Sequence, residues 1–220
     1  MVESYGDRHK APLAELEALL HTIGAQLDIQ VTAYLIGGCA MSMRGLKDAT
    51  KDADIIVRTA EERAAIRVVM QNLKFNLLSS GPFQGTRPKE YEGFHGDLWR
   101  RPGQVGLDVF ERTIMEDRFV LTDTMAARAT EVRKYGRLTV RLCSNEDIFL
   151  FKSLTGRPDD GPDIMRLVQT GLNVADMTSE LRAQPPRKGT AWRYHVVERL
   201  ENLEERGHGL IPWKHELLGE

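Results

Sequence analysis

The feature that most constrains the fold is the segment from residue 34 to residue 57, which contains two apolar runs. A glycine pair follows the first run, and two aspartates stand at the start of the second. The first run ends at Gly37-Gly38, and the second carries Asp52 and Asp54 with one residue between them. Glycines let backbone amides approach an anion closely, and a helix that begins there adds partial positive charge. Residues i and i+2 of a strand lie on one face, so the two carboxylates can share divalent cations. The segment predicts a strand, a phosphate-binding turn and a second strand with a cation site.

Each part of this pattern also has an ordinary explanation. A Gly-Gly turn before a helix is more often structural than phosphate-binding, and an Asp-x-Asp pair on a strand is usually a solvated face. The combination favours binding, because two like charges beside the apolar run Ile55–Val57 repel each other and a cation relieves that repulsion.

Composition limits the class of protein. The 220 residues suffice for one large domain or a core with a helical annex, and 41% hydrophobic with 28% charged residues is typical of a folded chain. The net charge of −2 argues against a nucleic-acid coat protein. Two cysteines, far apart, argue against a disulfide scaffold or a zinc cluster. No apolar run reaches the roughly 18 residues of a membrane span, and the polar start does not resemble a secretory signal, so we expect a cytoplasmic protein without membrane contact.

The periodicity of apolar residues predicts an α/β (α+β) fold. Expected strands are 30–36, 53–57, 75–78, 96–99, 105–110 and 138–142. Expected helices are 12–27, 39–46, 61–73, 122–132, 146–154, 162–170, 174–181 and 190–206. We therefore expect a core of residues 1–143, a small mixed sheet with helices packed on it, followed by a C-terminal helical region of residues 144–220.

Gly37-Gly38 followed by Asp52-x-Asp54 resembles the glycine pair and paired carboxylates of the DNA-polymerase-β-like nucleotidyltransferase superfamily. Thirteen residues separate the two motifs, near the upper end of the superfamily's range. The resemblance implies a third carboxylate on a later strand between apolar residues. Asp108, in Leu-Asp-Val, fits that description best, and Asp97, in Gly-Asp-Leu-Trp, is the alternative.

A second stretch is similar to small nucleotidyltransferases related to the AbiEii-type toxins. In that group a helix lysine is followed by an arginine and then by Asp-x-x-Asp, and Lys152, Arg157, Asp160 and Asp163 match these positions. The segment 144–147 resembles the capped helix start of the group and is a good N-cap signal by itself. One departure is that Cys39 stands where many transferases place a serine after the glycines.

The resemblance implies a role for each residue. Asp52 and Asp54 would hold two Mg²⁺ ions, with Mn²⁺ as an alternative, and Asp108 would hold the ion nearer the acceptor hydroxyl and take its proton. Lys152, with Lys47 or Lys51, would neutralise the triphosphate; alone, it reads more readily as a solvated helix lysine. The residues expected to contact the nucleotide are Gly37, Gly38, Ser42, Arg44, Lys51, Arg157, Asp160 and Asp163.

The predicted activity is metal-dependent transfer of a nucleoside monophosphate from an NTP to an acceptor hydroxyl, with release of pyrophosphate. The acceptor would be a tRNA or other RNA, a protein or a small molecule. The alternatives are an inactive nucleotide-binding regulator and a toxin–antitoxin partner protein, with an antitoxin as a partner. The pair Arg100-Arg101, in a glycine- and proline-rich region, is expected to pack or to contact an acceptor nucleic acid. No P-loop, G-x-G-x-x-G or H-E-x-x-H motif is present.

Overall fold

The computed structural model describes residues 9–79, 96–114, 119–155, 160–186 and 189–219. The strands of its main sheet are β2 (Val31–Ile36), β4 (Asp52–Val57), β5 (Asn76–Ser79), β6 (Asp97–Arg100), β7 (Gly106–Glu111), β10 (Glu131–Tyr135) and β11 (Leu138–Leu142). The helices are α1 (Leu13–Gln26), α2 (Gly37–Met43), α3 (Ala60–Asn72), α4 (Asp123–Arg128), α5 (Asn145–Thr155), α6 (Asp160–Val168), α7 (Val174–Ala183) and α8 (Trp192–Glu205). This confirms the predicted mixed α/β fold with C-terminal helices.

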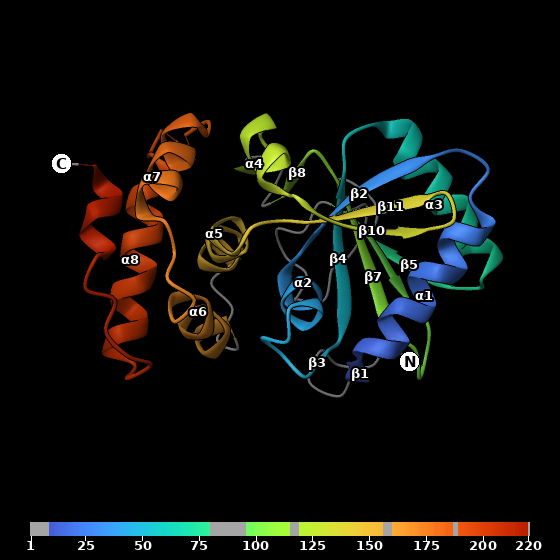
Figure 1. Ribbon diagram of the computed structural model, residues 1–220, viewed down its shortest axis with the longest axis horizontal. Helices are drawn as coiled ribbons and strands as arrows, with labels where there is room; N and C mark the ends of the chain where they lie inside the picture. The colour runs from blue at the N-terminus through green and yellow to red at the C-terminus, as the bar shows by residue number, and fades with distance from the viewer. Residues whose placement is uncertain (1–8, 80–95, 115–118, 156–159, 187–188, 220) are drawn as a thin grey trace.

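The seven strands are ordered β10-β11-β2-β4-β7-β6-β5. The pairs β11–β2 and β4–β7 are parallel and the other four pairs are antiparallel, so the sheet is mixed as expected. Figure 1 shows α1 and α3 on one side of this sheet and the helices α5 to α8 beyond its other side. Among the described helices, none is long and apolar enough to cross a membrane.

Helix α3 begins at a local capping signal in the sequence and packs on strands β4 and β7 of the sheet. Thr59 accepts a hydrogen bond from the backbone N–H of Glu62, whose carboxylate accepts one from the Thr59 N–H, which forms a capping box. The apolar face of the helix, with Ile66, Val69 and Met70, is buried. This packing covers the face of β4 and β7 that lies opposite the carboxylates described below.

One predicted element is wrong. Residues 122–132 were expected to be helical, but α4 ends at Arg128 and residues from Glu131 onward form strand β10. Strand β10 pairs with β11 through a tight turn at Gly136, whose φ of +61° suits glycine. The five cross-strand pairs of this hairpin outweigh the weak helical periodicity of the segment.

Several short elements carry too little periodicity to be predicted. Strand β1 (Ala11–Pro12) pairs with β3 (Ala49–Thr50), and β8 (Thr113–Ile114) pairs with β9 (Phe119–Val120). A 3-10 helix, η2 (Lys214–Leu218), packs against α7 and α8. The β1–β3 pair matters for function because it lies beside the cavity described below.

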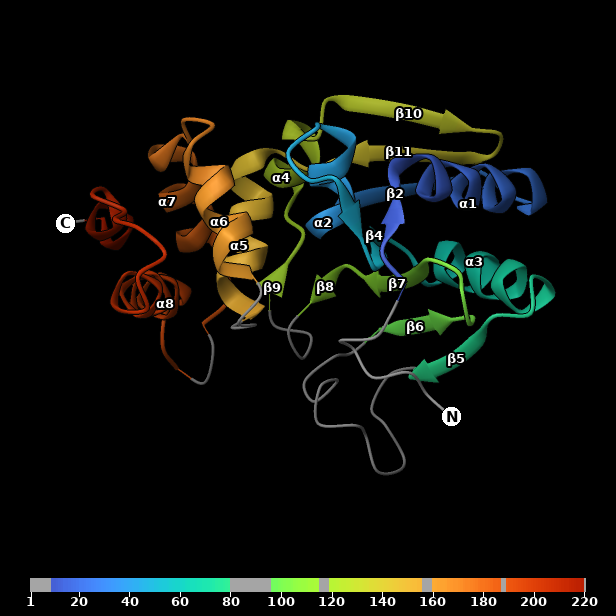
Figure 2. The same ribbon diagram turned by 90° about the horizontal axis from the view of Figure 1, so that it is seen from below.

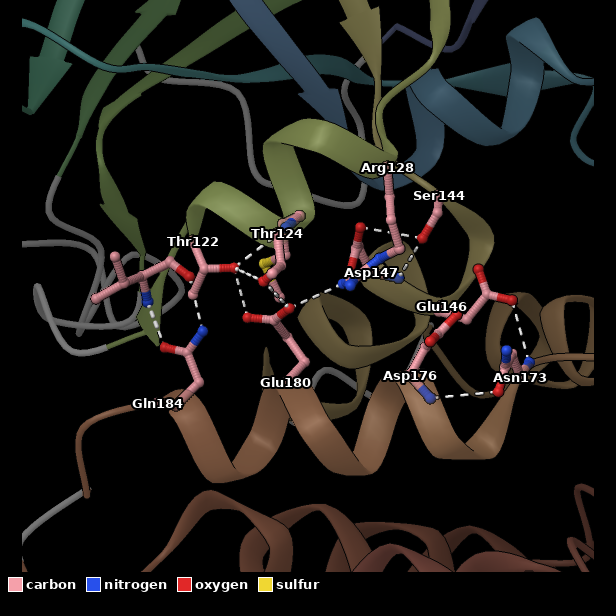
Figure 3. A network of polar contacts seen from close by, with 12 residues as sticks. Thr122, Thr124, Arg128, Ser144, Glu146, Asp147, Asn173, Asp176, Glu180 and Gln184 are labelled. Carbon is pink, nitrogen blue, oxygen red and sulfur yellow. Dashed lines mark hydrogen bonds and ion pairs between the residues drawn. The ribbon is translucent and has the colours of Figure 1, made fainter.

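The C-terminal helices are joined to the core by a buried polar network, shown in Figure 3. Arg128 on α4 donates to Asp147 on α5 at 2.5 Å and to Glu180 on α7 at 2.9 Å. Ser144 caps α5 by accepting from the Asp147 N–H, so the predicted capped start is present. Burial raises the pKa of Asp147, against the opposing effect of Arg128.

Apolar contacts support the same junction. Phe119 on β9 packs edge-on against Phe151 on α5 and against Trp192 on α8, with ring centroids 5.5 and 5.4 Å apart. The helical region therefore has a fixed position relative to the sheet, and the cavity between them has a defined shape.

Candidate functional site

Three carboxylates lie on one face of the sheet, on two neighbouring strands. Asp54 on β4 is paired in register with Asp108 on β7, and Asp52 is paired with Gly106. Because side chains alternate along a strand and paired residues share a face, Asp52, Asp54 and Asp108 project to the same side. Asp52 and Asp108 are buried, and Asp54 is partly exposed.

Asp97, the alternative to Asp108, points to the other face. It is paired with Val109, one residue along β7 from Asp108, so its side chain lies on the α3 side of the sheet. There it accepts hydrogen bonds from Arg63 and Arg67 of α3 at 2.7 to 3.1 Å. The structure thus brings Asp108, and not Asp97, to the paired carboxylates.

The glycine pair lies directly against this carboxylate group. Gly37 begins α2 with a φ of +65°, and a Cβ there would collide with the carboxylate of Asp54. A Cβ on Gly38 would lie 2.7 Å from Oγ1 of Thr50. Gly37 is therefore needed for the close approach of α2 to β4, and Gly38 for its approach to β3. Helix α2 begins at Gly37, two residues before the predicted helix start at Cys39. Burial raises the pKa of the Cys39 thiol well above its ordinary value, which makes it a poor nucleophile.

The guanidinium of Arg100, which the sequence did not place at this site, lies between Asp52 and Asp108. Arg100, at the end of β6, donates from Nη1 to Oδ1 of Asp108 and from Nη2 to Oδ2 of Asp108 at 3.1 Å. Its Nη2 also lies 3.3 Å from Oδ1 of Asp52. The sequence placed Arg100 among packing or acceptor-contacting residues, because its pairing partner across the sheet was not known.

A cavity of about 400 Å³ opens beside Asp52 and Asp54, between the sheet and the C-terminal helices. Its wall is rich in cationic side chains from four segments of the chain. The lining residues are Lys10, Gly38, Lys47, Ala49, Thr50, Lys51, Asp52, Asp54, Lys152, Asp160, Pro162 and Asp163. Lys10 was missed by the sequence analysis, and it reaches the cavity because β1 pairs with β3.

The C-terminal side of the cavity is an ion-pair cluster that the motif of α5 and α6 supplies. Lys152 Nζ lies 2.8 Å from Asp160 Oδ1 and 2.9 Å from Asp163 Oδ2, and Lys47 Nζ lies 2.5 Å from the same Asp163 oxygen. Lys152 is buried, which excludes the alternative of a solvated helix lysine. Burial opposes the charge of Asp163, but Lys152 and Lys47 outweigh it and hold its pKa below the ordinary value.

Other predicted contacts lie elsewhere. Arg44 donates to Glu131 at 2.6 Å and to Asn145 at 3.1 Å, at the junction of β10 and α5 and away from the cavity lining. Ser42 is buried, its hydroxyl has no hydrogen-bond partner among the described residues, and it does not line the cavity. Arg157 lies outside the described residues.

The donor set suits a hard divalent cation, because Mg²⁺ and Mn²⁺ prefer carboxylate oxygens. Asp52 and Asp54 face the cavity together, so these two residues fit a cation that arrives with a ligand there. Within the described ranges, no three His, Cys, Asp or Glu side chains converge as a ready-made metal group. Arg100 already stands beside Asp52 and Asp108 as a positive charge.

Comparisons with known proteins give structural likeness only. No protein-family model and no curated protein matches the chain. A nucleotidyltransferase-like antigenic protein from Paracoccidioides brasiliensis is 20% identical, with a TM-score of 0.47 over 90% of this chain and 91% of that chain. ANT(2")-Ia, solved in complex with adenylyl-2"-tobramycin, is 18% identical, with a TM-score of 0.48 over 74% of this chain and 92% of that chain. At these values an inference about activity has to come from the site itself.

Proposed function

We propose that the chain is a divalent-cation-dependent nucleotidyltransferase, which moves a nucleoside monophosphate from an NTP to an acceptor hydroxyl. The observation that carries this proposal is the in-register placement of Asp54 and Asp108, with Asp52 on the same face, next to a lysine-rich cavity. Carboxylates on one face of a sheet, beside cationic side chains, provide both parts of such a site, one for a cation and one for a polyphosphate.

The cavity provides the nucleotide side of the reaction. Its volume of about 400 Å³ lies within the range of small-molecule pockets, about 300–1,000 Å³. Lys10, Lys47, Lys51 and Lys152 line it, and lysines bind phosphate as point charges. We expect the triphosphate to lie along these lysines, with its α-phosphate toward Asp52 and Asp54.

Asp52 and Asp54 would hold the divalent cation, which when bound neutralises phosphate charge and polarises the phosphoryl oxygens. The acceptor hydroxyl oxygen forms a bond to the α-phosphorus, the bond from that phosphorus to the bridging oxygen breaks, and pyrophosphate leaves. The hydroxyl proton passes to the carboxylate of Asp108. An ionised carboxylate has about four acceptor positions, so Asp108 can accept from Arg100 and still take a proton.

A second candidate function is a nucleotide-binding regulator without turnover, which could act in a toxin–antitoxin pair. The contact of Arg100 with Asp108 favours it, because the guanidinium occupies both oxygens of the carboxylate that would take the hydroxyl proton. Both candidates bind an NTP in the same cavity, and they differ in whether the α-phosphate is transferred.

The test is to incubate the chain with each α-³²P-labelled NTP and Mg²⁺ or Mn²⁺, with total RNA, cell lysate or an aminoglycoside as acceptor. An active transferase labels one acceptor class and releases pyrophosphate. We expect Asp54→Asn to lower labelling by about 10²–10³-fold. Asp28→Asn is the matched control, because Asp28 is exposed and outside the cavity. Titration with an α,β-imido NTP analogue measures binding separately. Binding without transfer supports the regulator, and absence of binding overturns both functions.

A further inference from the structure

The row of residues across β4, β7 and β6 explains how Arg100 reaches the carboxylates. Figure 2 shows β7 between β4 and β6. Leu98 is paired with Asp108, and the pairing of β6 with β7 ends one residue later, at Trp99 and Leu107. The side chain of Arg100, the next residue, lies against Gly106, which is paired with Asp52. One row therefore reads Asp52, Gly106, Arg100, and the next row reads Asp54, Asp108, Leu98.

Because Gly106 has no side chain, the side chain of Arg100 can extend over it towards Asp52. A Cβ on Gly106 would lie 2.8 Å from Nη1 of Arg100 and 3.1 Å from its Cδ, and it would also collide with the carboxylate of Asp52. Arg100 is fixed further by a hydrogen bond from Nη1 to the carbonyl oxygen of Trp99 at 2.9 Å. Its side chain is only 13% exposed. The guanidinium thus has a built position with both backbone and side-chain partners.

The cavity divides the carboxylates into two groups. Asp52 and Asp54 line it, whereas Asp108 and Arg100 do not. Asp108 receives both guanidinium nitrogens of Arg100, which is the geometry that makes arginine–carboxylate pairs strong. One guanidinium therefore already contacts two of the three carboxylates, Asp108 and Asp52, and occupies the side of the group that faces away from the cavity.

We propose that Arg100 is a resident cation of this site, which takes the place of the second metal ion, so that the site binds a single divalent cation with its nucleotide. The single ion binds on the cavity side, at Asp52 and Asp54. Arg100 is a positioning residue that keeps the carboxylate of Asp108 oriented through both guanidinium nitrogens. This inference rests on the proposed function, and it replaces the two ions that the sequence resemblance implied.

The experiment counts Mn²⁺ ions. The full chain is mixed with the α,β-imido NTP analogue and titrated with Mn²⁺, and bound Mn²⁺ is followed by electron paramagnetic resonance. Two ions at the separation of a two-metal site, about 3.5–4 Å, give a spin-coupled signal that a single ion does not. We expect one uncoupled Mn²⁺ per wild-type chain, and two coupled ions in Arg100→Gln, because the loss of the guanidinium opens Asp108 to a metal.

Two further variants serve as controls. Arg100→Lys keeps a positive charge and is expected to stay at one ion. Arg101→Gln removes the neighbouring arginine, which donates to the carbonyl of Leu73 and not to the site, and it should also stay at one. Two coupled ions in the wild type, or a single ion in folded Arg100→Gln, would overturn the inference. If Arg100→Gln does not fold, the wild-type count decides.

The same experiment separates this inference from the proposed function. Two coupled ions together with label transfer would leave the transferase intact and remove the role of Arg100. A wild-type chain that binds neither the analogue nor Mn²⁺ would overturn the function and the inference together.

Discussion

Arg128 and Arg100 each bridge two carboxylates, in very different surroundings. Arg128 joins Asp147 to Glu180 between α4, α5 and α7, and Arg100 joins Asp52 to Asp108 across the sheet. Both guanidiniums are mostly buried, with 24% and 13% of their side chains exposed. The difference lies in what else the carboxylates contact.

The two carboxylates that Arg128 joins also accept hydrogen bonds from neighbouring hydroxyls. Glu180 also accepts from the hydroxyls of Thr122 and Thr124 at 2.5 and 2.8 Å, and Asp147 accepts from Ser144 at 3.0 Å (Figure 3). The Arg100 group instead has a third carboxylate, Asp54, beside it and a lysine-lined cavity in front. Carboxylates that are hydrogen-bonded by the side chains around them stabilise a junction between helices. Carboxylates that line a cavity instead point to a site for a ligand.

Arg128→Ala should give the largest effect, a loss of stability that distinguishes the Arg128 network from the Arg100 group. It leaves Asp147 and Glu180 buried without their cation, and breaking such a pair costs about 3–5 kcal/mol of unfolding free energy. Urea denaturation measures the loss. Arg133→Ala on the exposed β10 is the control, and it should change stability by less than about 0.5 kcal/mol. An equal effect of both variants would show that the network does not fix the junction.

Asp54→Asn should show the opposite profile, with activity lost and stability kept. Removal of one charged group that acts on the transition state typically lowers kcat by about 10²–10³-fold. The substitution also relieves repulsion with Asp52 and Asp108, so the urea midpoint should not fall. A variant that unfolds more easily and transfers label normally would mark Asp54 as structural.

Lys47→Ala tests whether the cavity lysines hold the triphosphate. Lys47 is shared between Asp163 and the cavity, and Asp163 keeps Lys152 after the change. A hydrogen bond to a charged group contributes about 1.5–3 kcal/mol, so we expect the KM for NTP to rise about 10-fold or more with little change in kcat. Lys134→Ala, on exposed β10, is the control. A fall in kcat at constant KM would contradict this role.

The smallest of these effects is the pH dependence of stability, which should differ in sign between Asp163 beside the cavity and Asp147 in the Arg128 network. The pKa of Asp163 is held below 3.8, so its stabilisation is complete above that pH and is lost as the pH falls through its folded pKa. The pKa of Asp147 is raised above 3.8, so its ionisation costs stability as the pH rises through its folded pKa.

Denaturation midpoints across the acid range, compared with Asp163→Asn and Asp147→Asn, measure both slopes. Asp163→Asn should weaken the loss of stability at low pH, and Asp147→Asn should weaken the loss as the pH rises. The same slope change in both variants would refute the assignment.

The sequence was sufficient for features that depend on local periodicity. Asp52 and Asp54 share a face because strands repeat every two residues, and Ser144 caps α5 because the cap signal is local. The pairing of strands across the sheet could not be predicted from the sequence, because periodicity gives no information about which strands are neighbours. The flanking residues favoured Asp108 over Asp97, but the register of β6 against β7 is what places the two carboxylates on opposite faces.

The same limit explains what the sequence missed at the site. Arg100 meets Asp52 across Gly106, which has no side chain to block the contact, and from there it also reaches Asp108 on the same strand as Gly106. Lys10 reaches the cavity through a two-residue strand, which has no periodicity to detect. Both contacts join segments far apart in the sequence, so neither propensity nor spacing could reveal them.

The position of β2 in the sheet has a consequence for how the chain folds. β2 ends at Ile36 and pairs in parallel with β11, which ends at Leu142, so the centre of the sheet cannot close until most of the chain is available. Long-range parallel pairing slows folding, because the intervening chain must be ordered first. On the ribosome, a nascent chain that has left the exit tunnel only as far as β7 would expose the edge of β2 that later pairs with β11. We expect chaperones to bind this incomplete sheet.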